Sequence, residues 1–140
     1  MNVACGIALA SDLTVHDRAT VAEEFATEME WLKDAKFGIL IHWGIYGVND
    51  DGDSWPIFSN RIPFEDYMKR SGSFTAERYD PNQWANLFKG AGARYAVLTT
   101  KHHDGTTLWD TQAGDLDVVG KTPAGRDLAD LLLRRCVKTG

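Results

Sequence analysis

Residues 95–105 read YAVLTTKHHDG, an apolar run that ends in a group of polar side chains. Residues 37–44, FGILIHWG, have the same form, because an apolar run again ends at a histidine, His42. A helix signal lies between the two runs, and strands joined through a helix usually lie parallel, with their carboxyl ends at one edge of the sheet. We therefore expect His42 to converge with His102 and His103 at that edge. Three imidazoles gathered in this way indicate a site for a polar ligand.

The sequence predicts an α/β protein in which helices alternate with strands. The strands are expected at residues 37–41 and 94–100, and the nearly uniform apolar character of the first suits burial on both faces of a sheet. The expected helices cover residues 20–34, a short segment that starts at Pro63, residues 80–92 and about residues 125–138. The third of these is the best marked, because Asp80 is a good N-cap, Pro81 takes the first helical position and glycines follow the last turn.

The chain has 140 residues, a length that suggests one domain. Residues 1–16 carry no periodic pattern and are expected to be a loose tail, which leaves residues 17–140 as the folded part. No G-x-G-x-x-G follows either strand, so a dinucleotide-binding sheet is disfavoured relative to a (β/α)8 barrel. A barrel typically needs about 250 residues, and two parallel strands cannot close one. We therefore expect the N-terminal portion of a (β/α)8 TIM-like barrel, about two βα units and incomplete. The alternative is self-association, in which the open sheet edges pair with a second copy.

Composition excludes several classes of partner. The 15 basic and 20 acidic side chains give a net charge of −5 without a basic cluster, so we expect no nucleic-acid partner. No run approaches the roughly 20 apolar residues of a membrane span, so no membrane partner is expected. Residues 1–10 are apolar but short and lack a basic flank, so no convincing signal peptide is predicted and the compartment stays open. Cys5 and Cys136 form no C-x-x-C motif, and neither a metal nor another cofactor is predicted.

Two motifs resemble those of a known family. Residues 31–46, WLKDAKFGILIHWGIY, are similar to the first-strand signature of α-L-fucosidases of glycoside hydrolase family twenty-nine. Residues 91–105, AGARYAVLTTKHHDG, are similar to the second-strand signature, and residues 108–111 and 126–128 continue the likeness in order. The resemblance covers roughly residues 28–138. It implies a (β/α)8-like catalytic barrel that hydrolyses terminal α-L-fucosyl linkages of fucosylated oligosaccharides or glycoconjugates with retention of configuration.

The same resemblance assigns a sugar pocket. It implies that His42, His102 and His103 bind fucose and that Trp55 lines the sugar site. Imidazoles can donate and accept hydrogen bonds, as hydroxyl groups do, and an aromatic wall suits the apolar methyl group of fucose. The family's catalytic Asp nucleophile and Glu acid/base are expected beyond Gly140. No catalytic residue is therefore assigned in this chain, which should be inactive alone.

Two positions depart from the family pattern. Ser54 stands directly before Trp55, where many members have a Glu that contacts a sugar hydroxyl. Thr106 follows the Asp-Gly pair, where an aromatic residue is usual. The first change removes one expected carboxylate contact, and the second is expected to loosen the packing beside the pocket.

Other interpretations of these residues stay open. The three histidines and Asp104 offer nitrogen and oxygen ligands that suit zinc in a metal-dependent hydrolase, although no H-x-H pair lies on one strand. A non-catalytic sugar-binding or interaction remnant is the third interpretation. Asp104 is expected to orient its neighbours or to form a turn rather than to react. Trp43 and Trp84 are expected to pack in the core.

Overall fold

The computed structural model describes residues 25–26, 29–48 and 55–138 of the 140-residue chain. Its centre is a pair of parallel strands, β1 (Gly38–His42) and β2 (Tyr95–Thr99). The register runs from Gly38 opposite Tyr95 to His42 opposite Thr99, so the carboxyl ends of both strands meet at one edge. The structure therefore confirms the two strands, to within a residue at each end, and their parallel arrangement.

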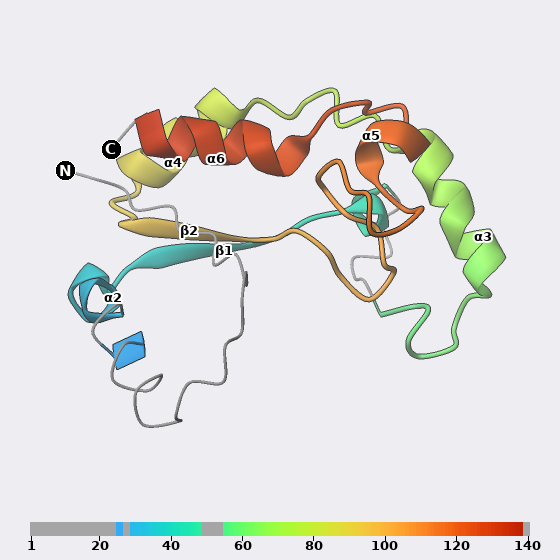
Figure 1. The fold of residues 1–140 in the computed structure, drawn as a ribbon, viewed down its shortest axis with the longest axis horizontal. Coiled ribbons are helices and arrows are strands. Elements are labelled where there is room, and N and C mark those ends of the chain that lie inside the picture. The colour runs from blue at the N-terminus through green and yellow to red at the C-terminus, as the bar shows by residue number, and fades with distance from the viewer. Residues whose placement is uncertain (1–24, 27–28, 49–54, 139–140) are drawn as a thin grey trace.

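Two helices cover one face of the strand pair. Helices α4 (Pro81–Gly90) and α6 (Leu128–Lys138) lie side by side over it (Figure 1). Asp80 caps α4 as predicted, because its carboxylate accepts two backbone N–H groups of the first turn, at 2.8 and 3.3 Å. The helix ends at Gly90, and Gly92 has a φ of +81°, which residues with a Cβ rarely adopt.

The remaining elements are short. The connection between the strands also contains η1 (Ile45–Gly47), α3 (Phe64–Met68) and η2 (Lys69–Ser73), while α5 (Val118–Lys121) lies between β2 and α6. Helix α3 begins directly after Pro63, as predicted. Helix α5 has only four residues, and no periodic pattern in the sequence predicts it. None of the described helices has the length and apolar character that a membrane span requires.

The two faces of the sheet are covered unequally. Ile41 and Leu98 pack against the core under the helices, whereas Leu40 is 64% exposed and Val97 is 47% exposed on the other face. The expectation that the first strand is buried on both faces is therefore wrong for the described residues. The reason is that alternate side chains of a strand point to opposite faces, and α4 and α6 lie over only one of them.

The helix predicted before β1 is described only in part, because residues 20–24 and 27–28 lie outside the described residues. Helix α2 covers Glu30–Ala35, and the N–H of Met29 donates to the carbonyl of Phe25 at 3.0 Å, as in a helical turn. Phe25 is 62% exposed. Residues 1–24, with the predicted tail and the start of this helix, lie outside the described part of the chain.

Candidate functional site

The three histidines converge at the carboxyl edge of the strand pair. The ring centroids of His42, the last residue of β1, and His102 lie 5.2 Å apart. His102 and His103 are closer still, with their centroids 4.4 Å apart and their planes nearly perpendicular. The structure therefore confirms the prediction that the imidazoles following the two strands lie close together.

A turn, not a strand, carries the histidine pair. Strand β2 ends at Thr99, and the N–H of Gly105 donates to the carbonyl of His102 at 3.0 Å. Gly105 has a φ of +81°, so the turn needs a residue without a Cβ at this point. Because the strand has already ended, adjacent side chains need not point to opposite faces, and both imidazoles reach the cluster.

Asp104 holds this turn from within the protein. It is only 3% exposed, its Oδ1 accepts the N–H of Thr106 at 2.8 Å, and its Oδ2 accepts the hydroxyl of Tyr67 at 3.1 Å. Burial and the Asp104 carboxylate both raise the pKa of Tyr67 above its usual range. The same two causes raise the pKa of Tyr46 to about 12. These contacts confirm Asp104 as a turn-forming carboxylate.

The hydrogen bonds of His102 define its tautomer. The N–H of His103 donates to Nδ1 of His102 at 2.9 Å, so the neutral ring carries its proton on Nε2. Burial lowers the pKa of His102, and the neighbouring His103 and His42 lower it further. His102 is therefore a neutral group near pH 7 that can present an N–H donor.

Two aromatic side chains line the outer side of the cluster. The rings of Trp55 and His103 have centroids 4.6 Å apart, so the structure places this predicted residue beside the histidines. Phe58 stacks on the same imidazole, with centroids 5.3 Å apart and an interplanar angle of 27°. Phe58 was not singled out from the sequence. The signal that could have found it is an aromatic residue three positions after Trp55 in a segment with no helical or strand pattern.

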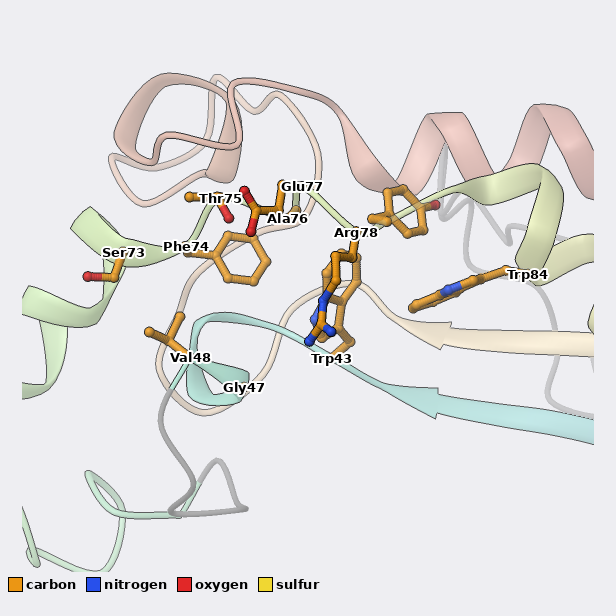
Figure 2. A pocket seen from close by; sticks show the side chains of 11 residues that line it. Trp43, Gly47, Val48, Ser73, Phe74, Thr75, Ala76, Glu77, Arg78 and Trp84 are labelled. Atoms are coloured by element: carbon orange, nitrogen blue, oxygen red, sulfur yellow. The ribbon is translucent and has the colours of Figure 1, made fainter.

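A pocket of about 340 Å³ lies elsewhere, on the helix side of the strand pair (Figure 2). Trp43 and Trp84 are in its wall, with ring centroids 5.2 Å apart, and both pack against the buried core. Their expected place in the core is confirmed. None of the four predicted site residues lines this pocket.

The structure describes only one of the two positions that depart from the family pattern. Ser54 lies outside the described residues. Thr106 is 5% exposed, and within the described part of the chain its hydroxyl has no hydrogen-bond partner. A buried polar atom without a partner is unfavourable.

A metal site finds no support in the side-chain geometry. No three His, Cys, Asp or Glu side chains among the described residues are arranged to hold a metal ion. Nδ1 of His102 and both oxygens of Asp104 already accept hydrogen bonds from the protein. Nδ1 of His102 has a single lone pair, so it would have to give up this donor before it could bind zinc.

Comparison with known proteins identifies the group to which this chain is related. The family model described as α-L-fucosidase matches residues 10–140. Tissue α-L-fucosidase of Bos taurus is 40% identical over 94 residues, which are 56% of this chain and 20% of that protein. Plasma α-L-fucosidase of Homo sapiens is 39% identical over 97 residues, which are 59% of this chain and 21% of that protein. The chain thus spans about a fifth of the length of these relatives.

Solved structures agree with the sequence comparison. The α-L-fucosidase isoenzyme 1 of Paenibacillus thiaminolyticus superimposes with a TM-score of 0.76 and 42% identity, over 82% of this chain and 27% of that chain. The α-fucosidase of Thermotoga maritima in complex with fucose superimposes with a TM-score of 0.68 and 37% identity, over 79% of this chain and 32% of that chain. All of these relatives are glycoside hydrolases. Within that class, the chain belongs to the α-L-fucosidase family.

Proposed function

We propose that the full-length protein hydrolyses terminal α-L-fucosyl linkages of fucosylated glycans with retention of configuration. The observation that carries this proposal is the convergence of His42, His102, His103 and Trp55 at the carboxyl edge of two parallel strands. This edge is where active sites of (β/α)8 barrels are found. The proposal includes such a barrel, of which this chain supplies two strands.

The four side chains suit a sugar in different ways. Sugar hydroxyls both donate and accept hydrogen bonds, so they pair with imidazoles in either role. His102, with its proton on Nε2, is suited to donate to a hydroxyl oxygen. Trp55 is 47% exposed and offers an apolar surface to the methyl group or ring carbons of fucose. We propose that His42 and His103 complete the contacts to the sugar.

The reacting carboxylates are proposed to lie outside residues 1–140. A retaining glycosidase needs two carboxyl groups about 5–5.5 Å apart, one to attack the anomeric carbon and one to donate a proton. Asp104, the carboxylate nearest to the histidines in sequence, is buried and accepts hydrogen bonds on both oxygens. Residues 1–140 alone would therefore bind part of the sugar without cleaving it.

The test is to follow the product of the full-length protein by proton NMR. We expect the α anomer of L-fucose to appear first from a fucosylated oligosaccharide, before mutarotation. First appearance of the β anomer would contradict the retaining mechanism. Fucose release by purified residues 1–140 would show that the reacting carboxylates are in this chain.

The two other interpretations can be tested with the same preparation. Loss of activity on dialysis against a chelator, restored by zinc, would favour a metal-dependent hydrolase. Calorimetric binding of free fucose without hydrolysis of any fucoside would favour a non-catalytic sugar-binding protein. The described residues contain no group of three His, Cys, Asp or Glu side chains arranged to hold a metal ion, which favours the metal-independent proposal over the first of these.

A further inference from the structure

Trp55 and Phe58 form an exposed aromatic surface at the outer side of the histidine cluster. Trp55 is 47% exposed and Phe58 is 66% exposed, although their rings contact each other with centroids 5.2 Å apart. Large aromatic side chains that remain exposed beside a polar site are a common feature of ligand contacts. The proposed fucose contacts use Trp55 and leave Phe58 without a role.

The segment that carries Phe58 is held in place by its backbone. Pro56 is fully buried, and its carbonyl accepts the N–H of Arg61 at 2.9 Å. The carbonyl of Trp55 accepts both the N–H and the hydroxyl of Ser59, at 2.9 and 2.8 Å. Because the turn is already closed, a ligand that stacks on Phe58 does not have to order this segment.

The order of ring contacts places Phe58 at one end of the cluster. His42 contacts His102, His102 contacts His103, and His103 contacts both Trp55 and Phe58. In the described residues the ring of Phe58 has no stacking or edge contact with the rings of His42 or His102. A sugar bound among the imidazoles would therefore leave the Phe58 ring beside the next unit of the glycan.

We infer that Phe58 is a specificity-determining residue that stacks against the pyranose ring of the leaving group, the sugar to which the fucose is attached. This inference rests on the proposed function. A pyranose ring presents several C–H groups on one face, and such a face packs against an aromatic ring while its hydroxyls stay in water. The protein should thus prefer fucosides of a second sugar over fucosides whose leaving group has no ring.

The experiment compares two substrates in the full-length protein. One is a fucosyl-N-acetylglucosamine disaccharide, and the other is α-L-fucosyl fluoride, whose leaving group has no ring. The measured quantity is kcat/KM for the disaccharide divided by kcat/KM for the fluoride. We expect Phe58→Ala to lower this ratio about 3- to 10-fold, the size of a lost aromatic contact.

Two further variants serve as controls. Phe64→Ala removes another exposed aromatic ring, from α3, that has no ring contact with the histidines in the described residues, and it should leave the ratio unchanged. Phe58→Tyr keeps the ring and should keep the ratio within about 2-fold of the wild type. Thermal unfolding of each variant checks that the fold is retained.

The outcomes separate the inference from the proposed function. If Phe58→Ala lowers kcat/KM equally for both substrates, or for neither, Phe58 does not contact the leaving group and the inference is wrong. That equal loss is also expected if another part of the full-length protein packs on Phe58. If the wild-type protein cleaves neither substrate, the proposed function is wrong, and the inference is then wrong as well.

Discussion

Replacing Tyr67 with Phe should destabilise the protein by about 2 kcal/mol. Tyr67 is fully buried, and its hydroxyl donates to Oδ2 of Asp104 at 3.1 Å. A hydrogen bond to a charged group contributes roughly 1.5–3 kcal/mol, because its loss leaves a buried charge without one of its partners. The 3.1 Å separation places the expected cost in the lower half of this range. The aromatic ring, over which the guanidinium of Arg70 lies at 4.5 Å, is retained in the variant.

Two other buried tyrosines provide matched controls. The hydroxyl of Tyr79 donates to the neutral carbonyl of Leu128 at 2.9 Å, so Tyr79→Phe should cost only about 1 kcal/mol. The hydroxyl of Tyr46 has no hydrogen-bond partner among the described residues, so Tyr46→Phe should be neutral or slightly stabilising. The expected order of destabilisation is therefore Tyr67, then Tyr79, then Tyr46.

Urea unfolding of the full-length protein measures this order. The free energies of unfolding can be compared directly if the dependence on urea concentration is the same in all variants. We also expect Tyr67→Phe to lower kcat/KM for a fucoside, because Asp104 holds the turn that carries the histidine pair. A cost for Tyr67→Phe that does not exceed that of Tyr79→Phe would refute the argument that Asp104 is a buried charge in need of this donor.

The remaining predictions concern the histidines and the strand pair. His42→Ala or His103→Ala should each cost about 2–4 kcal/mol of transition-state stabilisation, and wild-type kcat/KM in both variants would refute the pocket assignment. The pKa of His102 lies below its ordinary value of 6.5, so an NMR titration of its ring should give a midpoint below 6.5. The unfolded chain then takes up this proton first, and the stability contributed by neutral His102 is present above about pH 6.5 and lost as the pH falls. A Cβ at Gly38 would overlap the ring of Tyr95 on the neighbouring strand, so Gly38→Ala should cost about 1–3 kcal/mol in urea unfolding, and unchanged stability would contradict the close approach.

The strands and the main helices could be predicted because their signals are local. Helix α4 has an N-cap, a proline in its first turn and glycines after its end, so all its bounds are encoded within about a dozen residues. The apolar runs at β1 and β2 are equally local, and the rule that strands joined through a helix lie parallel supplied their relative direction. Convergence of His42 with His102 followed from those two facts alone.

The parts that could not be predicted depend on contacts between distant residues. Nothing near Tyr67 in sequence indicates that its hydroxyl will meet Asp104, 37 residues later. The position of Phe58 beside His103 is likewise set by the path of the connection between the strands. The uncovered face of β1 was missed for a different reason, because an apolar run gives no sign of how many helices cover it.

The candidate site consists of two layers with different exposure, and this division has a consequence for substitution. His103 and Phe58 are exposed and take little part in the core, so changing them should alter ligand binding more than stability. Tyr67 and Asp104 lie beneath them and are almost fully buried, so changing them should alter stability first and activity through the displaced turn. A turn that carries the candidate ligand contacts lacks the hydrogen bonds that make a strand rigid. The buried carboxylate of Asp104 restores rigidity to this turn, because both of its oxygens accept hydrogen bonds. On this view the histidine turn can serve as a binding surface because Asp104 beneath it is held by hydrogen bonds from Tyr67 and Thr106.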